Sequence, residues 1–293
     1  MEIGFFLPRL EREKLFPLLE TAKIEKVELD SPYIYEERDI LPQLLQRGIQ
    51  ILSVHAPYGE KNDLSSPEDK IRKLALAKLR RLITSLPSDQ RLKIVIHASP
   101  PLKKEEYARR KEYFKSSLED LLTLAEKFKV TLALENLPPG YLGDKAEDLK
   151  EILETFPSPY LGVCLDVGHA HLTEGIEEFF TILKEKIVTT HIHDNNGNED
   201  LHLPPPYGTI CWNKLIQKWE EEKVSFPLII EAYPWGKEEW VWLTIEIENF
   251  FSGKILQEGG CYLKCKTCGH FLFGDKKNPF CYCKKESLIG RAL

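Results

Sequence analysis

Residues 92–135, LKIVIHASPPLKKEEYARRKEYFKSSLEDLLTLAEKFKVTLALE, contain the pattern that decides the fold. An apolar run at 92–97 is followed by a charged segment with apolar residues at helical spacing at 103–128, and a second apolar run follows at 130–135. Short apolar runs that flank a helical segment are typical of a β–α–β unit with parallel, buried strands. This stretch therefore predicts one repeat of a parallel sheet that is covered by helices.

The same unit recurs along the chain. Further strands are expected at 2–7, 26–30, 49–55, 160–166, 186–193 and 227–233, and further helices at 11–22, 38–47, 67–85, 144–155, 174–185, 212–223 and 237–251. Eight strands alternating with eight helices predict an α/β fold, namely a (β/α)8 TIM barrel. A doubly wound open sheet is the alternative, but it would be expected to carry a Gly-rich loop after its first strand, where this chain reads PRLERE.

Local signals refine two details. Ser66, Pro67 and two following acids are expected to open the helix at 67–85, with Ser66 as its N-cap. Two isolated cysteines, Cys164 and Cys211, are expected to be buried packing residues.

Composition limits the possible classes of protein. The chain has 293 residues, of which 42% are hydrophobic and 29% charged, as in a globular protein of one large domain or one domain plus a small module. It has no apolar run of about 18 residues and no basic signal-peptide start, so a cytoplasmic location without a membrane partner is expected. A formal net charge of −6 disfavours nucleic acid as a partner, although a local basic patch remains compatible with it.

Five of the seven cysteines lie between 261 and 283, after a Gly259-Gly260 break. We therefore expect a barrel domain at 1–252 and a zinc-ribbon-like module at 260–285. The expected ligands of a structural zinc ion in this module are Cys265, Cys268, Cys281 and Cys283. Cys261 or His270 could replace one of them, and the role of the module in stapling, protein docking or nucleic-acid contact stays open.

Metal-capable side chains stand at the end of six consecutive predicted strands. They are His55, His97, Glu135, Asp166 with His169 one turn later, the pair His191 and His193, and Glu231. The carboxyl ends of barrel strands form one ring, where the active sites of such barrels lie. Imidazole and carboxylate together suit a divalent ion such as Zn, Mn or Co. The sequence therefore predicts one shared metal site at this end of the barrel, next to the stretch TTHIHDNNGNEDLHLPPPYG (189–208), which is rich in metal-capable side chains.

The chain resembles a known superfamily in the order and strand placement of six segments. These are SVHAPYG (53–59), VIHAS (95–99), ALENLP (133–138), LGVCLDVGHAHL (161–172), THIHDNNGNEDLHLPPPYGTICW (190–212) and LIIEAY (228–233). Over roughly residues 1–250 they resemble the sugar phosphate isomerase/epimerase superfamily, the xylose isomerase-like barrels that are related to endonuclease IV.

The resemblance implies a set of roles. Its core metal ligands correspond to Glu135, Asp166, His191 and Glu231, and the His-x-x-Asp spacing favours His191 over His193. His169 matches a position that binds substrate in the isomerases and a further metal in the endonucleases. The remaining ligands of the trinuclear endonuclease site correspond to His55, His97, Asp200 and His202. His193 is then either a second inward-facing ligand or a hydrogen-bonding partner.

Three functions follow. The first is a metal-dependent isomerase or epimerase, or a related dehydratase, acting on a small sugar or sugar phosphate. Glu135 and Glu231 would transfer the proton, His169 would hold a substrate oxygen, and the metal would stabilise the enediolate. The alternative is an endonuclease IV-like phosphodiesterase acting on abasic DNA. The acidic chain, and the lack of an aromatic wedge in the segment GEKNDLSSPEDKIRK (59–73), speak against it. A third reading, a non-catalytic scaffold, is disfavoured by the full ligand set.

Overall fold

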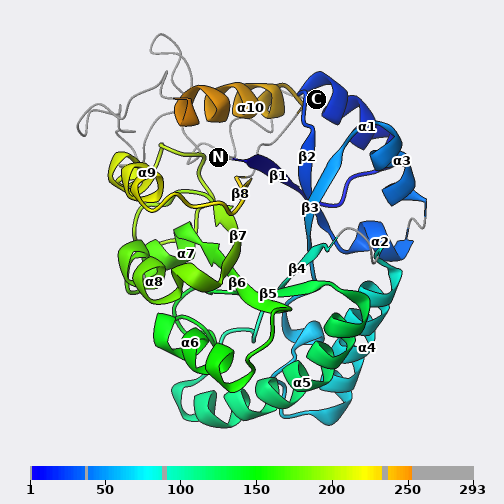
Figure 1. Ribbon diagram of the computed structural model, residues 1–293, viewed down its shortest axis with the longest axis vertical. Helices are drawn as coiled ribbons and strands as arrows, with labels where there is room; N and C mark the ends of the chain where they lie inside the picture. The colour runs from blue at the N-terminus through cyan, green and yellow to red at the C-terminus, as the bar shows by residue number, and fades with distance from the viewer. Residues whose placement is uncertain (1, 37–38, 88–90, 233–236, 253–293) are drawn as a thin grey trace, which may run out of the picture.

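A computed structural model describes residues 2–36, 39–87, 91–232 and 237–252. Its parallel strands close into a barrel in which each strand pairs with the next one in sequence and β8 pairs with β1 (Figure 1). The predicted (β/α)8 barrel is thus confirmed. The predicted module at 260–285, with its four cysteines, lies outside the described residues.

The expected strands all occur, within a few residues of their predicted bounds. They are β1 (Ile3–Leu7), β2 (Lys26–Asp30), β3 (Gln50–His55), β4 (Lys93–Ile96), β5 (Thr131–Glu135), β6 (Leu161–Asp166), β7 (Ile187–Ile192) and β8 (Leu228–Ile230). The helices are α1 (Arg12–Thr21), α2 (Pro32–Glu36), α3 (Ile40–Gln46), α4 (Asp69–Ser85), α5 (Tyr107–Phe128), α6 (Ala146–Thr155), α7 (Val167–Leu172), α8 (Ile176–Leu183), α9 (Trp212–Glu221) and α10 (Lys237–Phe251). The short helices α2 and α7, which directly follow β2 and β6, were not expected.

The predicted start of α4 is wrong by two residues. The helix begins at Asp69, and Ser66 accepts a hydrogen bond from the Glu68 backbone N–H at 3.2 Å instead of capping the helix. The reason lies in the preceding loop, where buried Asp63 accepts hydrogen bonds from the Ser65 N–H and hydroxyl, both at 2.8 Å. Asp63 also pairs with the Arg110 guanidinium, so residues 63–66 are held as a turn.

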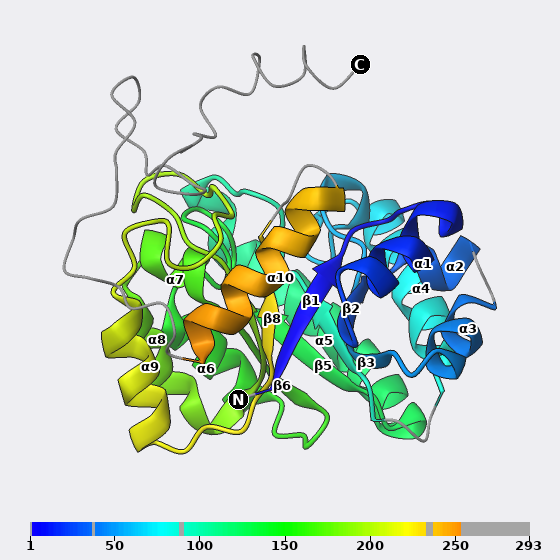
Figure 2. The same ribbon diagram turned by 90° about the horizontal axis from the view of Figure 1, so that it is seen from above.

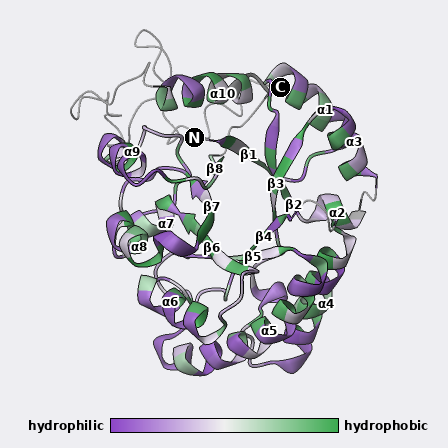
Figure 3. Ribbon diagram, in the orientation of Figure 1, coloured by the Kyte–Doolittle hydropathy of each residue, from purple (hydrophilic) through white to green (hydrophobic). Residues whose placement is uncertain are grey.

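The main core lies between the barrel and its helices, whose outer faces are hydrophilic (Figure 3). Inside the barrel, Val95, Ala133 and Cys164 form a small apolar layer. Cys164 is buried as expected, whereas Cys211 is exposed at the N-cap of α9, contrary to the expectation. In the described part of the chain, no helix has the length and apolarity that a bilayer span needs.

Candidate metal centre

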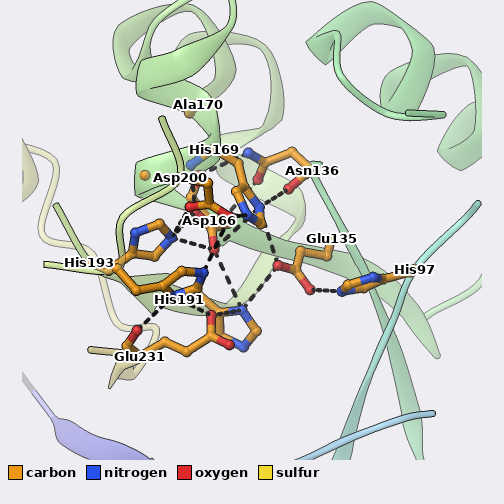
Figure 4. Close-up of polar contacts among 12 residues, drawn as sticks. His97, Glu135, Asn136, Asp166, His169, Ala170, His191, His193, Asp200 and Glu231 are labelled. Atoms are coloured by element: carbon orange, nitrogen blue, oxygen red, sulfur yellow. Dashed lines mark hydrogen bonds and ion pairs between the residues drawn. The ribbon is translucent and has the colours of Figure 1, made fainter. Parts of the chain in front are cut away.

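The metal-capable residues converge at the carboxyl end of the barrel (Figure 4). The long loop that follows β7 lies at the same end (Figure 2). A central group contains Glu135 from β5, Asp166 from β6, His191 from β7 and Glu231 directly after β8. All four are buried, and each offers one ligand atom, with these atoms within 4.8 Å of one another. The strand order thus brings four remote parts of the chain to one point.

Two further groups flank the central one. His55 and His97 share the Glu135 carboxylate, with His97 Nε2 only 2.8 Å from Glu135 Oε2. The second flanking group consists of His169, His193, Asp200 and His202. Every residue that the sequence predicted as a metal ligand in the barrel therefore lies in one of three adjoining groups. Metal binding itself stays a prediction.

In four of these histidines, one ring nitrogen is held by a hydrogen bond. The other ring nitrogen is thereby turned toward the central group or a flanking group. The Nδ1 atoms of His55, His169 and His202 lie 2.8, 3.0 and 2.8 Å from the backbone oxygens of Ala56, Asn136 and Glu231. His191 is fixed through Nε2, so its Nδ1 faces Glu135 and Glu231 at 3.2 and 3.1 Å. Such outer hydrogen bonds set the tautomer of metal-binding histidines, so this donor set fits a bound cation.

The partner of His191 Nε2 is Glu28, at 2.9 Å. Glu28 lies in the middle of β2, is fully buried, and also accepts a hydrogen bond from Ser53. The sequence analysis missed this residue. The only available signal was an acid within the apolar strand KVELD, and an acid in an alternating strand usually faces solvent.

Asp166 is held rigidly by its neighbours. Asn136 donates to the Asp166 carbonyl oxygen and accepts from its N–H, both at 2.8 Å, and Asp166 Oδ1 accepts from the His169 N–H at 2.7 Å (Figure 4). His193 Nε2 lies 3.0 Å from Asp166 Oδ1, and its ring stacks on that of His202 with centroids 3.9 Å apart. His193 Nδ1 is buried without a hydrogen-bond partner. His193 thus contacts the central group and also belongs to a flanking one.

Buried Asp194 fastens the loop that carries Asp200 and His202. Its carboxylate accepts hydrogen bonds from the N–H groups of Asn195 and Ile210 at 2.8 and 3.2 Å, and from Trp212 Nε1 at 2.7 Å. Because these donors lie at both ends of the loop, the Asp194 carboxylate links the two ends by hydrogen bonds. Burial raises the pKa of the Asp194 carboxyl to about 6, against the lowering effect of these donors.

The cluster is a dense set of opposite charges. Burial lowers the pKa of His55, but the Glu135 carboxylate outweighs it and the net result is a rise to about 9. The pKa of His202 also rises to about 9, because Glu231 and Asp200 outweigh the effect of burial. Conversely, burial raises the pKa of Glu135, but His191 and His97 hold it well below its usual range. Without a cation, the Glu135 carboxylate is therefore ionised and lies beside protonated imidazoles such as that of His55.

A cavity of about 340 Å³ opens above the groups, and Glu135, His169 and Glu231 reach it. Its other lining residues include aromatic and proline side chains such as Tyr58, Tyr141 and Pro100. This size is at the lower end for small-molecule sites, which range from about 300 to 1,000 Å³.

This barrel and its ligand groups define a class: the chain belongs to the xylose isomerase-like TIM barrel family, whose model matches residues 16–242. It is 34% identical over 180 residues to the uncharacterized protein MJ1614 of Methanocaldococcus jannaschii. The aligned region covers 61% of this chain and 69% of that protein. It is also similar to a solved D-tagatose 3-epimerase-like protein, with 24% identity, a TM-score of 0.71, and coverage of 87% of this chain and 99% of that one. A zinc-bound IolI protein has 17% identity and a TM-score of 0.71 over 88% of this chain and all of that one (100%).

Proposed function

We propose that the protein is a divalent-metal-dependent isomerase or epimerase that acts on a small sugar or sugar phosphate. One observation carries the proposal. The buried carboxylates of Glu135 and Glu231 both reach the small cavity, and both lie within 3.2 Å of His191 Nδ1. Two carboxylates beside one small substrate can divide the removal and the return of a proton between them.

The residues would act as follows. A bound divalent ion would polarise the substrate carbonyl and reduce the cost of the negative charge that develops beside it. One carboxylate, in Glu135 or Glu231, takes the proton from the carbon next to the carbonyl and becomes a carboxylic acid. In epimerisation, the other glutamate starts protonated and gives its proton to the opposite face of the same carbon, so the two glutamates exchange protonation states. In isomerisation, the first glutamate gives its proton to the former carbonyl carbon, while the proton of the neighbouring hydroxyl moves to the former carbonyl oxygen. His169 Nε2, at the cavity wall, holds a substrate oxygen.

Comparison with relatives supports the proposal. The structural neighbours include a D-tagatose 3-epimerase-like protein and the zinc-bound IolI protein, and the donor set described above suits zinc, manganese or cobalt. We also propose a structural zinc ion in a second unit at 260–285, beyond a barrel unit at 1–252. This zinc would be additional to any metal in the barrel.

The test is proton exchange. Metal-loaded protein is incubated with a panel of ketoses and their phosphate esters in D2O, and deuterium incorporation is followed by NMR. We expect incorporation next to the carbonyl of at least one sugar and its loss in Glu231→Gln, which keeps the shape of the side chain but cannot accept the proton. An unchanged exchange rate in Glu231→Gln would contradict the assigned role, and the absence of exchange across the panel would contradict the reaction.

A second candidate is a multinuclear phosphodiesterase acting on abasic DNA. The observation that favours it is the His55–His97–Glu135 group, because proton transfer on a sugar needs no separate ligand set there. Neighbouring metal ions can activate water and hold phosphate oxygens in an in-line displacement. Cleavage of a duplex with one abasic site, with no proton exchange on any sugar, would favour this function over the isomerase.

A further inference from the structure

A second cavity, of about 440 Å³, opens at the carboxyl ends of β2 and β3. Tyr58 lines both this cavity and the one above the ligand groups, and its ring centroid lies 5.2 Å from that of His55 and 4.9 Å from that of His97. Tyr58 is 57% exposed, so much of its surface is accessible to a bound molecule. A substrate molecule that extends past Tyr58 would have one end at the metal-capable residues of the central group and the other end in the second cavity.

The wall of the second cavity is basic on the side formed by α4. Lys78 and Arg81 both line it. Lys78 donates to Asn62 Oδ1, and the Arg81 guanidinium donates to the Tyr35 carbonyl oxygen at 3.1 Å, which leaves further N–H donors on both side chains. Neither forms an ion pair within the described ranges. Asp30 is the one acidic residue on the described wall of this cavity, and burial raises the pKa of its carboxyl.

An independent observation concerns Ser31, which also lines this cavity. Its side chain is buried, with 1% of the residue exposed, and its hydroxyl has no hydrogen-bond partner. A buried hydroxyl without a partner is unfavourable, so such groups are usually satisfied by protein, water or ligand. A ligand oxygen in the cavity would supply the missing partner.

We propose that the second cavity binds the distal phosphate of a phosphorylated sugar, through Lys78, Arg81 and Ser31, while the carbonyl end of that sugar lies at the ligand groups. This inference rests on the proposed function, because it selects phosphate esters from the sugars that the site could process. The described wall of the first cavity contains no Lys or Arg, so a distal phosphate would find neither an ammonium nor a guanidinium group there.

The test compares the affinities of D-fructose and D-fructose 6-phosphate for the metal-loaded full chain by calorimetry. The variants are Arg81→Gln and Lys78→Gln. Arg80→Gln is the matched control, since Arg80 lies on the same helix, pairs with Asp120 at 3.2 Å and is not on the cavity wall. We expect wild type to prefer the phosphate ester by about tenfold or more, as one charge-assisted hydrogen bond provides.

Arg81→Gln and Lys78→Gln should each remove most of this preference without changing the affinity for D-fructose, and Arg80→Gln should keep it. Equal wild-type affinities for the two sugars, or equal effects of Arg80→Gln and Arg81→Gln, overturn the proposal. Proton exchange separates it from the proposed function. Exchange on free sugars without a phosphate preference leaves the reaction standing and the phosphate site wrong. A phosphate preference that depends on Arg81, without exchange on either sugar, leaves the phosphate site standing and the reaction wrong.

Discussion

Glu28 lies 2.9 Å from Nε2 of His191, on the side of the imidazole ring that faces away from Glu135 and Glu231. Both partners are fully buried, so this hydrogen bond is not weakened by water. When a metal ion displaces the proton of Nδ1, the Glu28 carboxylate holds the remaining proton on Nε2, so the lone pair of Nδ1 is directed at the central group.

Glu28→Gln should therefore weaken metal binding at the central group by about 10–100-fold, the usual effect of removing such an outer partner. The measurement is a zinc titration against a competing chelator. Glu25→Gln, an exposed position just before β2, serves as the control and should match wild type. Equal zinc affinities in Glu28→Gln and Glu25→Gln would show that Glu28 does not position His191.

Metal affinity should depend on pH in a defined direction. The pKa values of His55 and His202 both rise to about 9 in the metal-free site. Both rings are therefore protonated on both nitrogens at pH 7, and a metal ion must displace one of these protons. The apparent affinity should increase as the pH rises from 7 through about 9, because these protons are then lost without the metal. Calorimetry at pH 7 in two buffers of different ionisation enthalpy should detect release of more than one proton per bound set of ions. Binding without proton release would contradict the charge balance described for the cluster.

Gly168 is required by its contact with His193. A Cβ atom at Gly168 would overlap the His193 ring, which is itself fixed by Asp166 and stacked on His202. Gly168→Ala should lower the free energy of unfolding by about 1–3 kcal/mol through overpacking.

The double variant Gly168→Ala/His193→Ala removes this clash, so it should be at least as stable as His193→Ala alone, because Ala is the better helix former in α7. Both comparisons are made by denaturant unfolding of the metal-free protein. If Gly168→Ala has the same effect with and without His193, the contact does not constrain the site.

The sequence predicts the barrel and most of the cluster because both follow from simple periodicity. Apolar runs set the strands, and in a parallel barrel every strand end points to the same ring, so residues such as Glu135 and Glu231 can be placed together without coordinates. Glu28 could not be found this way, since it lies within a strand whose inward face is known only once the barrel is closed. The second cavity could not be found either, because it joins Ser31 to Arg81 from another element.

The number of metal ions distinguishes the two candidate functions. His55 and His97 contribute only to the group that shares Glu135, so His55→Ala should remove about one equivalent of metal from the full chain and leave the central group intact. Elemental analysis of wild type and variant gives this difference directly, because metal bound elsewhere in the chain contributes equally to both. His171→Ala is the control, because His171 lies outside the three groups and its Nε2 contacts Thr209 at 2.8 Å.

For an isomerase that works at the central group, proton exchange should survive His55→Ala within about tenfold, because Glu135 and Glu231 are unchanged. For a multinuclear phosphodiesterase, the same substitution should reduce cleavage by several orders of magnitude, because one of the ions that hold the phosphate is lost. Loss of exchange together with a single equivalent of metal would mean that the His55 group takes part in the reaction on sugars, and the assignment of the chemistry to Glu135 and Glu231 alone would be wrong.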